Sequence, residues 1–252
     1  AAEPDERGIS AALLSGLLSH IGLQVVGRFR RLRVLDISRC DGVKILSPLS
    51  GLKALEVLRL PHVKCSAETL QDAFRQPAVN MQEILIDGEF LSDDLVLVFA
   101  SKFPNLVHLN LANSTVRGDD FACLEMLTAL RVLNLSATSV TDSAFIEIAK
   151  CTALEILVME NCRSITASNA DCLDPLRGLR VLNFNGSRNV GDGSVRAISA
   201  LGVETLRLAR CLISSLAFKF IAALERLRTL DVSGTEISDD GSEELVDCTM
   251  LE

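Results

Sequence analysis

The chain has 252 residues, 48% of them apolar, and a net charge of −8 from 25 Lys and Arg against 33 Asp and Glu. Nucleic-acid-binding surfaces concentrate Lys and Arg, so this charge predicts that no nucleic acid is bound. The longest apolar stretch, residues 9–26, is interrupted by Ser15, Ser19, His20 and Gln24, which predicts no membrane insertion. The opening AAEPDERG is acidic and does not resemble a secretory signal.

Residues 1–31 do not follow the pattern of the rest of the chain. The first eight are typical of a linker or frayed end, whereas residues 9–21, ISAALLSGLLSHI, can form an amphipathic helix. Repeat arrays need a covered end. We therefore expect a linker and helical cap over residues 1–31.

From residue 32 onward the sequence is a repeat with intervals of 23 to 26 residues. The first Leu of each unit, or its substitute, stands at Leu32, Leu55, Met81, Leu106, Leu130, Leu154, Leu179, Val203 and Leu227, and a tenth unit opens at Leu251. Such regularity is typical of a solenoid and defines one array over residues 32–252. Because the chain stops at Glu252 and lacks an initiator Met, we expect a fragment of a longer array, or self-association through an uncapped C-terminal end.

Each unit has two halves. The unit from Leu130 opens with an inward-facing triplet, Leu130, Leu133 and Leu135, which predicts a short strand in a parallel sheet over a continuous core. Apolar residues at helical spacing then predict convex helices over residues 66–74, 92–103, 141–151, 214–224 and 238–248. Acidic residues precede the helices, and their repetition indicates helix caps rather than a metal site: Asp93, Asp94, Asp119, Asp120, Asp142, Asp192, Asp239 and Asp240.

Over residues 32–252 the chain resembles the leucine-rich repeat superfamily, and within it the cysteine-containing subtype of F-box substrate receptors. The resemblance is carried by CDGV at 40, CRSI at 162, CLI at 211, SVTDSAF at 139 and EISDDG at 236. Other units carry Ser114, Thr138, Ser187 or Thr235 at the turn, so the array mixes subtypes, and no F-box precedes Leu32. The resemblance implies a right-handed α/β horseshoe with a concave sheet, and a ubiquitin-ligase role if an F-box adjoins.

The eight cysteines suit a packed core. Cys40, Cys162 and Cys211 fall at the turn, Cys65 at an inward position, and Cys151 and Cys248 at helix ends. No CxxC occurs, so neither a metal nor a cofactor is predicted. The absence of cysteine-rich caps favours a reduced, intracellular and cytoplasmic protein. Against this, sequons at Asn113, Asn134 and Asn185 suit a glycosylated surface receptor fragment.

Enzymatic activity is not predicted. His20, His62 and His108 lie in different units with no fixed Cys or acid beside them, and no nucleophile elbow, P-loop or HExxH occurs.

The concave face is the predicted binding surface, because residues two and four after each first Leu point away from the core. Val132, Ile156 and Val181 form an apolar stripe there beside a polar row. The predicted partner-binding residues are Arg59, His108, Asn110, Val132, Asn134, Ile156, Val158, Glu160, Val181, Asn183, Asn185, Arg207, Arg210 and Asp231.

Two plainer interpretations stay open: β-branched residues are favoured in any strand, and Asp36 with Arg59, or Arg207 with Asp231, can neutralise each other across neighbouring units. The sequence predicts a non-catalytic protein-binding module. The alternatives are the substrate-recognition arm of a ubiquitin ligase and a glycosylated surface receptor fragment.

Overall fold

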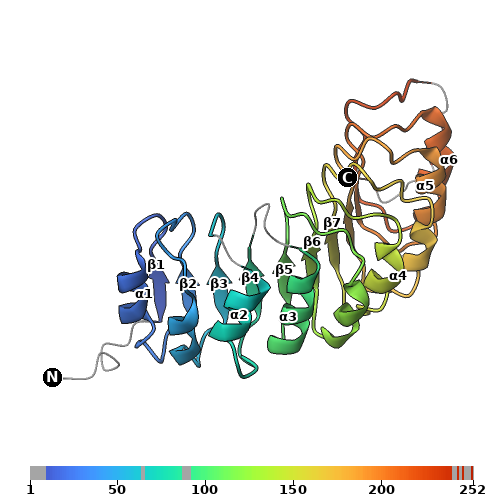
Figure 1. Cartoon of the computed structure of the whole chain (residues 1–252). Helices are drawn as coiled ribbons and strands as arrows, with labels where there is room; N and C mark the ends of the chain where they lie inside the picture. Colours follow the sequence, from blue (N-terminus) through green and yellow to red (C-terminus); the bar gives the residue numbers. More distant parts are fainter. Residues whose placement is uncertain are drawn as a thin grey trace.

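The computed structural model describes residues 10–63, 66–86, 92–239, 243, 246 and 251. They form a ten-stranded parallel sheet whose strands follow one another in chain order (Figure 1). Each strand has three residues: β1 (Ala11–Leu13), β2 (Val34–Asp36), β3 (Val57–Arg59), β4 (Glu83–Leu85), β5 (His108–Asn110), β6 (Val132–Asn134), β7 (Ile156–Val158), β8 (Val181–Asn183), β9 (Thr205–Arg207) and β10 (Thr229–Asp231).

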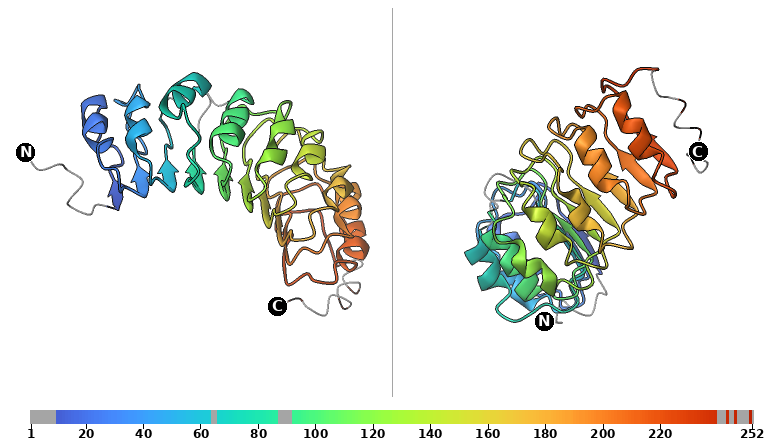
Figure 2. Two further views of the ribbon diagram at one scale, coloured as in Figure 1. Left: turned by 90° about the horizontal axis from the view of Figure 1, so that it is seen from below. Right: turned by 90° about the vertical axis from the view of Figure 1, so that its right-hand side faces the viewer.

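Helices cover the outside of the arc, and the strands line its inside (Figure 2, left). They are α1 (His20–Val26), η2 (Ser47–Gly51), α2 (Ala67–Ala73), α3 (Asp94–Lys102), η3 (Phe121–Met126), α4 (Ala144–Ile148), η4 (Ala170–Leu173), α5 (Asp192–Ile198), η5 (Ser215–Ala217) and α6 (Phe218–Ile221). The predicted solenoid with concave sheet and convex helices is confirmed. In three repeats a 3-10 turn, η2, η3 or η4, replaces the α-helix.

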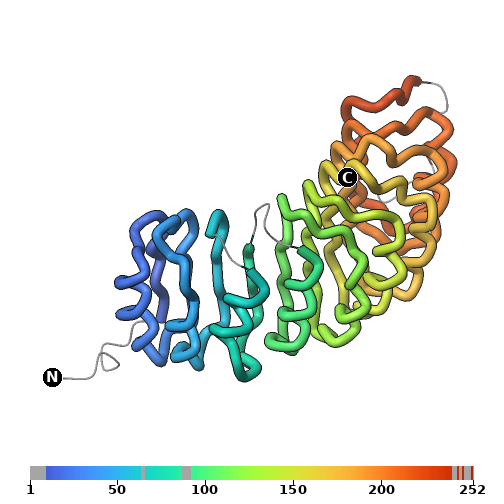
Figure 3. The backbone as a smooth tube through the Cα atoms, in the orientation of Figure 1, coloured from blue at the N-terminus to red at the C-terminus, as the bar shows by residue number. Residues whose placement is uncertain are grey.

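The counted register is also confirmed. Val34 lies beside Val57, and Leu133 lies between Leu109 and Leu157. The first Leu of every unit from Leu32 to Leu227 is buried, and the core runs through the array without a break. Figure 3 shows the resulting stack of coils.

Among the described residues, a left-handed turn follows every strand except β4, seven residues after the first Leu or its equivalent. Its φ lies between 55° and 73° in nine units, at Gly16, Arg39, His62, Asn113, Ala137, Asn161, Gly186, Arg210 and Gly234. Gly and Asn tolerate this conformation, whereas other residues are strained there by about 1 to 2 kcal/mol. The turn sends the chain away from the sheet and leaves its own residue at the rim.

The next residue forms a buried ladder. The thiols of Cys40, Cys162 and Cys211 donate to carbonyl oxygens of the preceding repeat at 3.3, 3.1 and 3.2 Å. The hydroxyl of Ser187 does the same to Met159 at 2.8 Å. The predicted burial of these cysteines is confirmed, and each also ties two repeats together.

The N-terminal segment corrects one expectation. Residues 9–21 do not form a cap helix: residues 11–13 are strand β1, paired in parallel with β2, and only residues 20–26 are helical. Ser19 caps that helix by accepting from the N–H of Gly22, and the helix begins eleven residues later than expected from amphipathicity. Residues 10–31 thus have the order strand, turn, helix, and we propose that they are a further repeat.

Asp94 and Asp192 lie in the first turn of their helices, as expected, but two of the acidic residues at helix starts also bond to the next repeat. Asp93 makes no capping bond to its own helix; its carboxylate accepts from the N–H groups of Arg117 and Gly118 in the next repeat. Asp192 likewise accepts from both the N–H and the hydroxyl of Ser214. These carboxylates therefore join consecutive repeats by hydrogen bonds. The predictions for Cys65, Cys248, Asp240, Glu252 and most of residues 238–248 lie outside the described residues.

Asp142 accepts the largest number of these hydrogen bonds. They come from the N–H groups of Thr166, Ala167 and Ser168 and from the hydroxyls of Thr166 and Ser168. Burial raises the pKa of Asp142, but these hydrogen bonds outweigh it and hold the pKa below its ordinary 3.8.

We therefore expect Asp142→Ala to lower the free energy of unfolding by about 1 to 3 kcal/mol at pH 7, measured by urea denaturation. Asp171→Ala, an exposed acid in η4 without such bonds, should change it by less than about 0.5 kcal/mol. Because the folded-state pKa is depressed, the stabilisation is complete above the unfolded value and disappears as pH falls through the folded value. The difference between wild type and Asp142→Ala should therefore be constant above about pH 5 and shrink below pH 3.8. An unchanged difference at pH 2 would contradict the assignment.

Candidate partner-binding surface

The apolar stripe lies where the sequence predicts it. Val132, Ile156 and Val181 are direct neighbours in β6, β7 and β8, and each is half-buried. Among the described residues, no helix covers the inner face of these strands (Figure 2, left). Three half-buried aliphatic side chains thus lie in one line across that face.

The asparagines beside the stripe have a structural task that the sequence did not reveal. The side-chain oxygens of Asn110, Asn134 and Asn183 accept from the backbone N–H two residues further on, at 2.9 to 3.0 Å. Asn183 is only 2% exposed, and its amide donates to Glu160 at 2.6 Å. These bonds shape the end of the strand, so Asn183 offers little to a partner, whereas Val158 stays half-exposed between Asn134 and Asn183.

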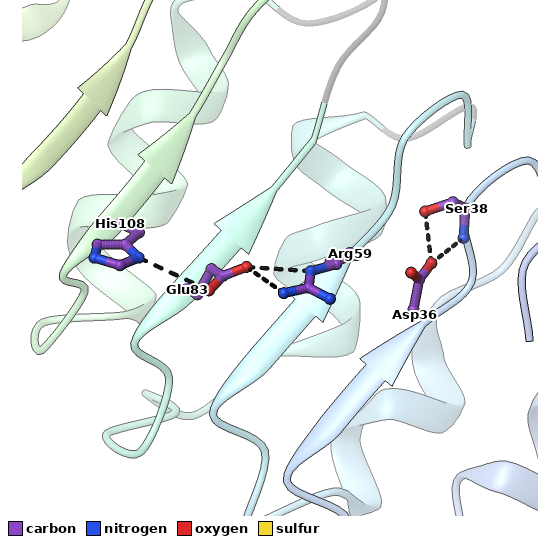
Figure 4. Close-up of polar contacts among 5 residues, drawn as sticks. All are labelled: Asp36, Ser38, Arg59, Glu83 and His108. Atoms are coloured by element: carbon purple, nitrogen blue, oxygen red, sulfur yellow. Dashed lines mark hydrogen bonds and ion pairs between the residues drawn. The ribbon is translucent and has the colours of Figure 1, made fainter. Parts of the chain in front are cut away.

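A charged cluster occupies the N-terminal part of the concave face (Figure 4). Glu83 lies between Arg59 at 3.0 Å and the Nδ1 of His108 at 3.7 Å. Asp36 accepts instead from the N–H and hydroxyl of Ser38. Arg59 is therefore neutralised by Glu83 on the following strand, β4, and not by Asp36 on the preceding strand, β2.

At the C-terminal part, Arg207 and Arg210 are exposed and form no side-chain hydrogen bond or ion pair with any residue that the structure describes. Hydrogen bonds from Ser233 lower the pKa of Asp231, helped by Asn185 and by the charge of Arg207. Asn185 also accepts from the N–H of Ala209 at 2.8 Å. Arg207 and Asp231 lie in register but are not a direct ion pair, so the arginine keeps its donors.

One charged row was missed by sequence reasoning. The residue after each first Leu alternates between Arg and Glu in several units, and neighbours form ion pairs: Arg33 with Glu56, Arg131 with Glu155, and Arg180 with Glu204. Hydrogen bonds from the arginines lower the pKa of Glu56 and Glu204. The alternation was visible in the repeat alignment. It neutralises the edge of the sheet where strands begin.

The described residues contain no group of three or more potential metal ligands. Burial raises the pKa of the thiols of Cys151 and Cys211 to about 12 and also raises that of Cys162. Such thiols are protonated at neutral pH and are poor nucleophiles. Within the same residues, no helix is long and apolar enough to cross a membrane.

Comparisons with known proteins agree with this architecture. A family model for the leucine rich repeat matches residues 226–246. The crystal structure of an internalin (inlF) from Listeria monocytogenes is similar over 100% of this chain and 88% of its own, with 16% identity and a TM-score of 0.58. The crystal structure of a TLR13–ssRNA13 complex is similar over 97% of this chain, with 20% identity and a TM-score of 0.61. This chain spans 38% of that one. A search of curated protein sequences finds no match. The chain therefore has the fold of an α/β leucine-rich-repeat solenoid.

The thiol environments generate a prediction. In the native protein at pH 8, a thiol reagent should modify Cys123 and Cys172, which are partly exposed, well before Cys40, Cys151, Cys162 and Cys211, which are buried. In urea all six should react at similar rates. The order can be measured by mass spectrometry of digested, labelled protein. Rapid native labelling of Cys162 would show that the ladder opens, contrary to expectation.

Proposed function

We propose that the chain is a non-catalytic interaction module that binds a protein partner on its concave face. The observation that carries the proposal is the uncovered stripe of Val132, Ile156 and Val181. Each of the three side chains is half-buried, and contiguous apolar side chains that keep contact with solvent are typical of interaction sites. The leucine-rich-repeat fold supports a general role in protein interaction.

Arg207 supplies the polar part of this surface. It lies two residues beyond Thr205, the neighbour of Val181 in the next strand. Its charge acts on Asp231, but its guanidinium forms no direct hydrogen bond or ion pair with the described residues. Arginine is enriched among the residues that contribute most to interfaces. The chain contains neither Trp nor Tyr, so we expect affinity to come from contact along several repeats.

A protein partner is favoured over nucleic acid. The similar TLR13 structure contains single-stranded RNA, but this chain carries a net charge of −8, which opposes binding of a polyanion along its length.

The test is capture of partners by the full-length protein, followed by affinity measurement. Ile156→Asp combined with Arg207→Glu should weaken binding at least about tenfold, because it places charge in the stripe and reverses the anchor. The matched control combines Ile146→Asp with Arg177→Glu. Ile146 lies in the convex helix α4 and is 53% exposed, and Arg177 lies at the edge of the sheet away from the turns. Equal loss in both variants, or loss in neither, would contradict concave binding.

A second candidate function is substrate recognition in an intracellular ubiquitin ligase. Reduced, buried Cys40, Cys162 and Cys211 in the turn ladder favour it, since this is the cysteine pattern of the F-box subtype. A cullin adaptor that co-purifies with the full-length protein would support it, and an adaptor-free complex with intact partner binding would speak against it.

A glycosylated receptor fragment is less favoured by the sequon geometry. The side chains of Asn134 and Asn185 already accept backbone hydrogen bonds, and Ser187 of the third sequon is fully buried. Asn113 is exposed at the rim. If the chain is expressed through a secretory pathway, we expect glycan mass at Asn113 and little at Asn134 or Asn185, as measured by mass spectrometry. Full occupancy at all three sites would contradict this ranking.

A further inference from the structure

A groove of about 910 Å³ lies where strands β6, β7 and β8 turn away from the sheet. Arg163 and Arg188 occupy the same position in adjacent repeats and both line it. Its other polar side chains are hydroxyl and amide groups, and no Asp or Glu is among them: Thr138, Ser139, Asn161, Ser164 and Asn189. Within the described residues, neither guanidinium forms a hydrogen bond or an ion pair.

The groove at the opposite edge makes the contrast clear. It also contains two arginines, Arg177 and Arg226, but Asp174 and Glu225 line it as well. Arg177 pairs with Asp174 at 3.3 Å. The arginines along the strand starts are likewise paired with glutamates. The groove of Arg163 and Arg188 therefore differs from the opposite one in having two arginines and no carboxylate among its lining residues.

The loops that carry these arginines are fastened to each other. The amide of Asn189 donates to the carbonyl of Arg163 at 2.6 Å, and the N–H of Cys162 donates to the hydroxyl of Ser187 at 2.9 Å. At Gly186, where φ is 73°, a Cβ would come within 2.2 Å of the side-chain oxygen of Asn161. These contacts fix the two loops relative to each other, so the backbone positions of the two arginines are set by the fold.

We propose that this groove binds the phosphoryl group of a phosphoserine or phosphothreonine in a protein partner. A phosphoryl group carries about −1.5 to −2 charges at pH 7 and three acceptor oxygens. Two guanidiniums match that charge and can each donate a pair of bonds, while the hydroxyls of Ser139 and Ser164 supply further donors. A carboxylate would leave one arginine uncompensated.

The inference rests on the proposed function, because the phosphoryl group belongs to a protein. It can fail separately, since peptide binding to the groove is measured without the partner that tests the concave face.

The experiment is a fluorescence-polarisation titration of the full chain with a labelled Gly-Gly-phosphoSer-Gly-Gly peptide. We expect saturable binding to wild type, and Arg163→Gln with Arg188→Gln should weaken it at least about tenfold, the usual effect of losing charged hydrogen bonds. The matched control, Arg177→Gln with Arg226→Gln, removes the same charge from the opposite groove and should stay within about twofold of wild type. The Ser peptide should not bind, and the Glu peptide should bind more weakly.

Equal binding by wild type and the groove variant, equal loss in the control, or equal affinity for the Glu peptide would overturn the proposal. So would preferential binding of a short single-stranded RNA of matched charge. A second measurement needs no variant: inorganic phosphate added to isotope-labelled wild type should shift amide signals at residues 161–164 and 186–189. Shifts confined to residues 174–177 and 199–202 would place the anion at the wrong edge.

Discussion

In-register parallel stacking of three-residue strands is the constraint on which the rest of this structure depends. A strand of this length has no stability alone, and it gains stability from backbone bonds to its neighbours in the sheet and from the core beneath it. The pairs continue past the strands: the N–H of Leu111 donates to Asn134, and that of Leu135 donates to Val158. Any insertion that shifted one repeat by a single residue would move its Leu triplet out of the core.

Because the register is fixed, one position in the repeat becomes one row along the molecule. The row after the first Leu is a chain of Arg and Glu pairs. The turn row donates thiol and hydroxyl hydrogens to the preceding repeat. The acidic row accepts from the following repeat. Three rows thus join repeats to one another by different chemistry, and this leaves the concave stripe and the groove of Arg163 and Arg188 as surfaces whose groups are not taken up internally by the described residues.

The sequence was sufficient for the register but not for the partners of polar groups. The spacing of three leucines predicts an inward-facing triplet without any knowledge of neighbouring repeats. All three, Leu130, Leu133 and Leu135, are fully buried. Asp142 looked like a helix cap because local sequence shows only its own helix, whereas its bonds go to residues 24 to 26 positions later. Strand β1 was not predicted because Ala12 stands where the other units have Leu or Ile, and the surrounding Leu residues have the spacing of a helical face. The buried state of Asn183 also depends on a neighbour, Glu160.

The stripe and the groove are built on the same three repeats, and this proximity has an energetic consequence. Strand β8 carries Val181 at its start, and five residues after that valine Gly186 lines the groove. The bond from Ser187 to Met159 ties the groove loop of one repeat to the strand of the previous one. A partner that contacts both surfaces therefore meets an arrangement already ordered in the free protein, so little conformational entropy is lost on binding. Once its apolar segment lies on the stripe, a nearby phosphoryl group reaches the arginines as an intramolecular event at raised effective concentration. Two individually weak contacts on one stiff array can in this way give a strong and phosphorylation-dependent interaction without a deep pocket.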